Sequence, residues 1–174
     1  MKALAISDSH RNISFLRDII KTAKNITKFE QIWHLGDEFE DIDNIDFDGI
    51  IKKVPGTRHP LYFTNDCARI LSFPFGKFEI TLVHSPYDIP QKLAGSKRIF
   101  FYGHLHKPNI SQWHNGILAS PGHVNGSFDR GNEASFMIFE ENWNSANLSL
   151  FNYTGKLKEQ VKIEITDEKL VFTE

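Results

Sequence analysis

The stretch YGHLH, residues 102–106, places two histidines directly after an apolar run. That run, Ile99 to Tyr102, is typical of a buried strand. Gly103 lets the chain turn sharply there, because glycine has no Cβ. The imidazoles of His104 and His106 are therefore expected at the end of a strand, where open α/β sheets bind their ligands.

The composition indicates a globular protein and limits its partners. The chain has 174 residues, 40% of them hydrophobic and 24% charged, which predicts a single domain over residues 1–174. Its 20 basic and 22 acidic residues give a formal net charge of −2, so we expect neither duplex nucleic acid nor a membrane as a partner. The first ten residues, MKALAISDSH, do not resemble a signal peptide, and Cys67 is the only cysteine. Together these features predict a cytoplasmic protein.

The chain opens with the alternation strand, helix, strand. Strands are expected over residues 2–7 and 31–35, with an amphipathic helix over about 12–25 between them. Each strand leads into a carboxylate, Asp8 in one case and Asp37 in the other. This pattern is typical of a sheet whose strand ends form a site.

More strands are expected along the rest of the chain, and their close spacing near the C-terminus favours antiparallel pairing. A turn is expected at residues 74–76, a short helix at 87–94, and a solvated loop or short helix in the acidic segment 37–48. The further strands are expected at residues 50–54, 68–73, 77–83, 98–102, 109–113, 116–119, 134–140, 146–153, 160–165 and 170–173.

Six side chains of metal-ligand type share one position, just after a predicted strand. They are Asp8, His10, Asp37, His84, His104 and His106. Taken singly, a histidine at a strand end is usually a surface or hydrogen-bonded residue, and an aspartate there can form a turn or cap a helix. Their shared placement favours a metal site instead, because carboxylate oxygen and imidazole nitrogen suit manganese, iron or zinc. Six groups exceed the needs of one tetrahedral ion and suit two ions that share a bridging carboxylate.

In this order, the motifs resemble those of the calcineurin-like metallophosphoesterases, in particular their small single-domain bacterial and archaeal phosphodiesterases. The family pattern is D-x-H, G-D, G-N-H/C-D/E, a histidine after a strand, and G-H-x-H. In this chain the motifs read DSH (8–10), GD (36–37), GTRH (56–59), HS (84–85) and GHLH (103–106), and SPGH (120–123) stands for a later N-P-G-S turn. The resemblance covers about residues 1–155.

The resemblance implies an α/β fold in which two mixed β-sheets pack face to face and are flanked by helices. It also implies two divalent metal ions, manganese first among the candidates, with iron, zinc, nickel or magnesium as alternatives. The implied ligands are Asp8, His10 and His106 for one metal, His84 and His104 for the other, and Asp37 as the bridge. A hydroxide activated by both metals would then attack the phosphorus of a phosphodiester or phosphomonoester.

The third motif departs from the family pattern at three positions. Thr57 stands where the family has an asparagine that coordinates the second metal, so that site is expected to be weaker or to be completed by water. Arg58 stands where many relatives carry a histidine, and its planar guanidinium suits a phosphate clamp. His59 is either a proton donor that replaces that histidine or a surface residue that precedes Pro60 in an extended conformation.

Two functions follow from the resemblance. The first is a metal-dependent phosphoesterase acting on a small substrate, with nucleotides among the candidates because Tyr62, Phe63 and Tyr87 could stack on a base or simply pack. The alternative is a degenerate scaffold with a weakened second metal site, like the retromer subunit of this fold, which mainly binds proteins. Strand edges in the C-terminal hairpins leave a homodimer open.

Overall fold

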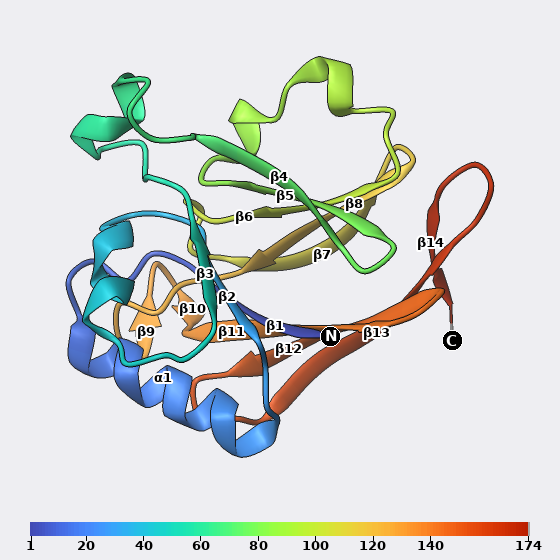
Figure 1. Ribbon diagram of the computed structural model, residues 1–174. Helices are drawn as coiled ribbons and strands as arrows, with labels where there is room; N and C mark the ends of the chain where they lie inside the picture. The colour runs from blue at the N-terminus through green and yellow to red at the C-terminus, as the bar shows by residue number, and fades with distance from the viewer. Residues whose placement is uncertain (174) are drawn as a thin grey trace.

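The structure is a computed structural model that describes residues 1–173, and it contains two large mixed β-sheets packed face to face (Figure 1). The strands of the seven-stranded sheet lie in the order β14 (Leu170–Thr173), β13 (Leu157–Ile165), β12 (Ser145–Asn152), β11 (Ser135–Asn142), β1 (Lys2–Ile6), β2 (Gln31–His34) and β3 (Ile50–Lys53). Those of the five-stranded sheet lie in the order β4 (Ile70–Phe75), β5 (Phe78–Val83), β6 (Arg98–Tyr102), β8 (Gly116–Pro121) and β7 (Pro108–Trp113). A separate hairpin consists of β9 (Phe128–Asp129) and β10 (Asn132–Glu133). The predicted fold class, two facing mixed sheets flanked by helices, is confirmed.

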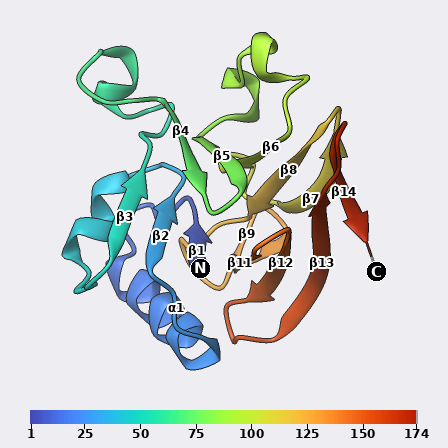
Figure 2. The same ribbon diagram turned by 45° about the vertical axis from the view of Figure 1, so that its right-hand side comes forward.

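The long helix α1 (Ile13–Ile26) covers the outer face of the seven-stranded sheet (Figure 2). Asn12 caps its N-terminus, because the Asn12 side chain accepts a hydrogen bond of 3.2 Å from the amide of Phe15. The apolar face of the helix is buried against strand residues such as Leu4 and Ile32. The members of that face recur every three or four positions, and they are Leu16, Ile19, Ile20 and Ala23. The other helical segments of the described chain are short 3-10 turns, Phe39–Asn44, Pro60–Phe63, Pro86–Asp88 and Gln91–Leu93.

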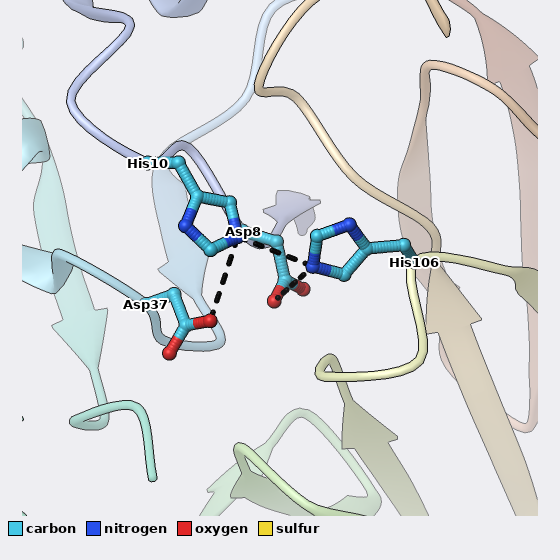
Figure 3. Close-up of side chains that lie close together, drawn as sticks. All are labelled: Asp8, His10, Asp37 and His106. Atoms are coloured by element: carbon cyan, nitrogen blue, oxygen red, sulfur yellow. Dashed lines mark hydrogen bonds and ion pairs between the residues drawn. The ribbon is translucent and has the colours of Figure 1, made fainter. Parts of the chain in front are cut away.

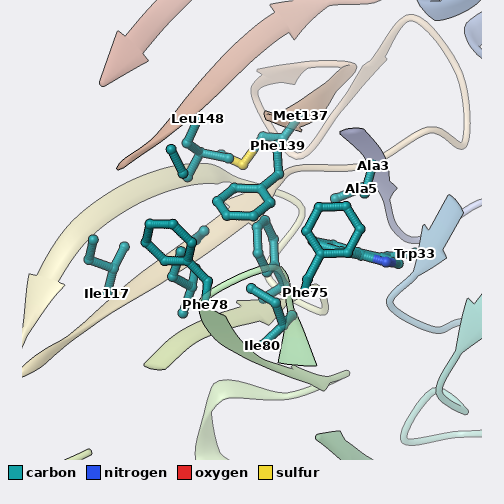
Figure 4. Packing of buried hydrophobic residues seen from close by; sticks show 14 of the residues in the cluster. Ala3, Ala5, Trp33, Phe75, Phe78, Ile80, Ile117, Met137, Phe139 and Leu148 are labelled. Atoms are coloured by element: carbon teal, nitrogen blue, oxygen red, sulfur yellow. The ribbon is translucent and has the colours of Figure 1, made fainter. Parts of the chain in front are cut away.

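Aromatic side chains fill the space between the two sheets (Figure 4). Trp33 of β2 meets Phe75 and Phe101 of the opposite sheet edge-on, with ring centroids 5.2 and 5.0 Å apart. Phe139 of β11 packs in the same way on Phe78, at 5.6 Å. Such edge-to-face pairs add about 0.5–1.5 kcal/mol each to the stabilisation that burial provides. The sheets are therefore held together by interlocking rings.

Parallel pairing aligns the ends of the strands that precede the predicted site residues. β1, β2 and β3 are mutually parallel in one sheet, and β5, β6 and β8 in the other. Past the strand ends, the amide of Asp8 donates to the carbonyl of Gly36, and the amide of Gly103 donates to the carbonyl of His84, both at 2.9 Å. The amide of His104 then donates to Asp8 Oδ2 at 3.0 Å and joins the two sheets. The four loops that carry the site motifs consequently lie together.

The C-terminal strands pair as the short spacings predict. β7 with β8, and β11 through β14 in succession, are antiparallel. β11 also pairs with β1, which joins the two ends of the chain in one sheet. None of the described helices is both long and apolar enough to cross a membrane.

Three segments differ from the sequence-based expectation. Pro74 lies within β4 rather than in a turn, which is tolerated because β4 is an edge strand and needs fewer amide donors. Residues 87–94 form two separate 3-10 turns instead of one short helix. The acidic segment contains a 3-10 turn in which Asp41 is buried, so it is only partly solvated.

Candidate metal centre

Four of the six predicted ligands converge on one point at the junction of the two sheets (Figure 3). One ligand atom each of Asp8, His10, Asp37 and His106 lies within 4.8 Å of the others. His10 Nε2 is 3.2 Å from His106 Nε2 and 3.5 Å from Asp37 Oδ2. His106 Nε2 is in turn 3.2 Å from Asp8 Oδ1. Two carboxylates and two imidazoles therefore face a common centre.

The two remaining predicted ligands lie on the other side of Asp37. His84 Nε2 is 3.3 Å from Asp37 Oδ1, whereas His10 faces the other carboxylate oxygen, Oδ2. The rings of His84 and His104 are in contact, with centroids 5.1 Å apart. Asp37 thus stands between two groups of histidines, which is the position that a bridging carboxylate requires.

The backbone at these positions is strained. The left-handed region of φ is costly for residues that have a Cβ, and such strain tends to concentrate at functional sites. Among the described non-glycine residues, those with positive φ include five of the six predicted ligands, with φ between 40° and 70°. These five are Asp8, His10, Asp37, His104 and His106.

Glycines in three of the motifs allow this close approach. A Cβ on Gly56 would lie 2.0 Å from Asp37 Oδ1, and one on Gly36 would lie 2.4 Å from His84 Nδ1. A Cβ on Gly103 would lie 1.9 Å from Ser7 Oγ and 2.7 Å from Asp8 Oδ2. All of these distances are shorter than a non-bonded contact allows. Each of the three glycines therefore leaves space that a candidate ligand or its neighbour occupies.

Two buried polar atoms support the presence of a cation. Asp8 and His84 are fully buried, yet Asp8 Oδ1 and His84 Nε2 have no hydrogen-bond partner among the described residues. Leaving such an atom unpaired is costly, and a buried carboxylate requires a compensating positive charge. The donor set, carboxylate oxygens and imidazole nitrogens, suits a divalent cation. The residues present therefore fit the divalent metal that this type of site binds.

Burial and neighbouring charged groups shift the pKa values of the candidate ligands. Burial alone would raise the pKa of Asp8, but the contact with His106 and the charges of His84 and His106 hold it below its usual value. Burial alone would lower the pKa of His106, but its contacts with Asp8 and Asp129 raise it. Burial, followed by the charge of His84, lowers the pKa of His104.

The third motif lies beside this centre. Gly56 contacts Asp37 closely and places the half-buried Thr57 next to it in the chain. Arg58 is exposed and, together with Arg11, lines a pocket of about 540 Å³ at the motif loops. His59 is extended, as expected before a proline, but its Nε2 lies 2.5 Å from Glu40 Oε1. His59 thus contacts Glu40 at the pocket wall and does not belong to the central cluster.

A buried network behind the DSH loop was not predicted from the sequence. Ser9 Oγ donates to Asp41 Oδ2 at 2.7 Å and lies 3.2 Å from His34 Nε2. The amide of Arg11 also donates to Asp41 Oδ2, at 2.8 Å. Burial lowers the pKa of His34 to about 4, so this imidazole is neutral near pH 7. The network holds the turn that carries Asp8 and His10, and the only sequence signal for it was that His34 precedes the GD motif.

The comparisons with known proteins agree with this fold. The model of the calcineurin-like phosphoesterase superfamily domain matches residues 1–143. YfcE, a phosphoesterase from E. coli, superimposes with a TM-score of 0.69 at 18% identity, over 92% of this chain and 98% of that one. A predicted phosphoesterase from Streptococcus pneumoniae TIGR4 superimposes with a TM-score of 0.65 at 17% identity, over 94% and 97%.

The same fold occurs in Vps29. Vps29 from Entamoeba histolytica, solved in complex with Zn²⁺, superimposes with a TM-score of 0.65 at 18% identity, over 93% of this chain and 99% of that one. At such identities, the solved structures show a shared fold and no more. No curated protein sequence matches the chain significantly. By the family model that spans most of its length, the chain belongs to the calcineurin-like phosphoesterase superfamily.

Proposed function

We propose that this protein is a metal-dependent phosphoesterase that hydrolyses phosphodiester or phosphomonoester bonds. The observation that carries the proposal is the convergence of Asp8, His10, Asp37 and His106 on one centre, where Asp8 Oδ1 is buried and unpaired. A site with this much uncompensated polarity is expensive to keep without a ligand. The family relationship supplies the reaction class.

The proposed centre holds two divalent ions, with manganese as the first candidate. Asp8, His10 and His106 would hold one ion, and the contacts of Asp37 on both sides support its role as the bridge to the other. His84, His104 and Thr57 complete the proposed second site. Divalent ions bound there would lower the pKa of water and neutralise the charge that develops on the phosphoryl oxygens.

The chain itself would bind and orient the substrate. Arg58 is exposed and has no ion-pair partner among residues 1–173, so its guanidinium is free to take a phosphate oxygen pair. Arg58→Ala should raise KM for phosphate-bearing substrates, while Arg58→Lys should recover only part of the loss because it lacks the planar fork. An unchanged KM in Arg58→Ala would exclude the clamp. His59 is the candidate proton donor, and its Nε2 faces Glu40 Oε1 at 2.5 Å.

A small aromatic phosphoester, such as a nucleotide, is the proposed substrate. Phe63 and Tyr87 support it, because they are 77% and 83% exposed in the loops that follow the third motif and His84. Tyr62 is buried and donates a hydrogen bond to Asp88, so it packs rather than stacks on a ligand. Turnover of the p-nitrophenyl ester of thymidine 5′-phosphate should fall in Phe63→Ala and Tyr87→Ala, while that of p-nitrophenyl phosphate should not. Equal losses on both substrates would exclude a stacking role.

The central experiment measures metal content and phosphoesterase turnover on the same purified sample. Protein stripped with a chelator and reloaded with Mn²⁺ should hydrolyse bis(p-nitrophenyl) phosphate, whereas Asp37→Asn and His84→Ala should not. Asp167→Asn and His114→Ala change an exposed residue of the same type far along the chain and should retain full turnover. A metal-loaded wild type that turns over no phosphoester would refute the enzyme.

The second candidate is a protein-binding scaffold with a weakened metal site. Thr57 favours it, because a threonine hydroxyl is a poorer neutral ligand than an amide oxygen. Vps29 from Chaetomium thermophilum, which has been solved with a bound cyclic peptide, shares the fold with a TM-score of 0.58. Metal binding without turnover in the experiment above would select this candidate.

We also propose a cellular compartment and an oligomeric state for the protein. A single cysteine, Cys67, supports work in a reducing cytoplasm. The position of β14 at the edge of the seven-stranded sheet supports a homodimer formed by strand pairing. Light scattering after gel filtration would show twice the monomer mass, and a monomer at all concentrations would exclude the dimer.

A further inference from the structure

The β9–β10 hairpin reaches the GHLH loop and contacts both of its histidines. The carboxylate of Asp129 is hydrogen-bonded to His106 Nδ1. The neighbouring Arg130 donates from Nη1 to the carbonyl oxygen of His104, at 3.3 Å. Arg130 Nε is also 3.7 Å from Asp129 Oδ2, which ties the two contacts together.

The contact with Asp129 decides which nitrogen of His106 can bind a cation. A neutral imidazole carries one hydrogen, so one nitrogen donates and the other presents a lone pair. Both nitrogens face a carboxylate, but only Asp129 is hydrogen-bonded, to Nδ1, whereas Asp8 Oδ1 makes no hydrogen bond to Nε2. A carboxylate only accepts, so the hydrogen sits on Nδ1. The lone pair then lies on Nε2, the atom that is 3.2 Å from both Asp8 Oδ1 and His10 Nε2.

The contact with Arg130 holds a strained segment in place. His104 and His106 have φ values of 70° and 56°, and Arg130 itself has 47°. Strained backbone persists only when its surroundings over-determine it. His106 is further confined by His123, whose ring lies 28° from parallel to it with the centroids 5.6 Å apart.

We propose that the β9–β10 hairpin is a clip on the GHLH loop, in which Asp129 is a positioning residue that selects the Nδ1–H tautomer of His106 and aims its Nε2 at the metal centre. Arg130 is the second contact of the clip and fixes the loop through the His104 carbonyl. The inference rests on the proposed metal centre. It adds a functional element whose residues carry none of the family motifs.

The first test measures metal affinity by titration with Mn²⁺. Outer carboxylate partners of a ligating histidine typically contribute 10- to 100-fold to metal affinity, so Asp129→Ala should weaken binding by about 10- to 100-fold. Asp129→Asn should weaken it too, because an amide offers both a donor and an acceptor and no longer enforces one tautomer. Phe128→Ala, an exposed neighbour in the same hairpin, should bind as the wild type does. Equal affinity in Asp129→Ala and the wild type would overturn the clip, as would an equal loss in Phe128→Ala.

The second test does not need the metal. Long-range ¹H–¹⁵N spectra of the metal-free protein, recorded in alkaline buffer where imidazoles are neutral, should show His106 as the Nδ1–H tautomer. In Asp129→Ala, His106 should shift to a mixture, whereas Phe128→Ala should leave it unchanged. A wild-type His106 in the Nε2–H form would overturn the clip even if metal binds. A wild type that binds no metal would refute the proposed function, while the tautomer would still decide the clip.

Discussion

Gly56 is the residue on which the position of Asp37 depends most directly. A Cβ at Gly56 would lie 2.0 Å from Asp37 Oδ1 and 2.6 Å from the Asp37 amide nitrogen, so the carboxylate would have to move. Gly56→Ala should therefore reduce Mn²⁺ affinity and phosphoesterase turnover together. Gly126→Ala is the matched control, because nothing lies within 4 Å of the added Cβ.

Both glycine variants are first compared by thermal unfolding, which separates a lost site from a lost fold. Metal affinity by titration then decides the prediction. If Gly56→Ala binds Mn²⁺ as tightly as the wild type, the close contact between Gly56 and Asp37 does not contribute to metal binding.

Thr57 tests the assignment of the second metal site. An asparagine at this position would offer an amide oxygen on a longer side chain, and a neutral amide is a better oxygen ligand than a hydroxyl. Thr57→Asn should tighten the weaker of two Mn²⁺ binding steps and leave the tighter one unchanged. Titration calorimetry resolves the two steps, and Thr64→Asn, an exposed threonine in the next turn, is the control. Unchanged affinity and stoichiometry in Thr57→Asn would contradict the assignment.

Site residues that directly follow a strand could be predicted from the sequence. Residues that reach the site only because the fold brings distant segments together could not. Asp8, Asp37 and His84 each follow an apolar strand, so their common edge was foreseeable. Asp129 lies 23 residues beyond His106 in a two-residue strand and has no pattern of its own. Asp41 belongs to an acidic run that is solvated by default, and only the fold shows it buried under Ser9.

At the scale of elements, helix α1 depends on a residue that also contacts the segment after β8. Asn12 Oδ1 caps the helix, and Asn12 Nδ2 donates to the carbonyl of Asn125 at 2.8 Å, next to the turn that follows β8. Loss of an asparagine cap typically costs about 1 kcal/mol, so Asn12→Ala should lower the free energy of unfolding by at least that much. Asn12→Asp keeps the cap but loses the donor, so it should lie between Asn12→Ala and the wild type.

The measurement for Asn12 is urea unfolding of the three proteins. If Asn12→Asp is as unstable as Asn12→Ala, the bond to Asn125 outweighs the cap. If both variants match the wild type, neither contact contributes to stability.

Most strands could be located from periodicity, but their partners could not. β6 and β14 begin and end where the apolar pattern places them, and most other predicted strands differ by one to three residues at their ends. The pairing of β1 with β11 joins segments more than 130 residues apart, and local pattern carries no information about it. Pro74 looked like a turn residue because its edge position is a property of the sheet.

At the scale of the whole molecule, the candidate centre exists only because two sheets meet. Asp8 and Asp37 come from the seven-stranded sheet, and His84 and His106 come from the five-stranded one. The interlocked rings of Trp33 and its neighbours fix the distance between those sheets. The centre and the core are thus stabilised by the same packing, so stability and metal binding should respond together to changes that reach both.

His34 provides such a change, because it is buried at the end of β2 and contacts the DSH loop through Ser9. Its pKa is lowered to about 4 in the folded protein, against about 6.5 for an unfolded histidine. Above pH 6.5 the imidazole is neutral in both states and has no effect on the pH dependence. Between pH 6.5 and pH 4 the unfolded chain binds a proton there that the folded protein does not, so the free energy of unfolding falls as the pH falls. By pH 4 this loss should be on the order of 3 kcal/mol.

His34→Gln removes this titration while keeping a polar group near Ser9, so unfolding of the metal-free variant should depend less on pH between 6.5 and 4 than that of the wild type. The comparison between the two proteins is needed because His104 and His123, whose pKa values are also lowered by burial, act in the same direction in both. His114→Gln, which changes an exposed imidazole, should retain the wild-type pH dependence. Urea unfolding at a series of pH values measures all three, and parallel curves for His34→Gln and the wild type would show that folding does not lower the pKa of His34. A flatter curve would show instead that the neutral imidazole behind the DSH loop makes the fold, and with it the metal centre, sensitive to acid.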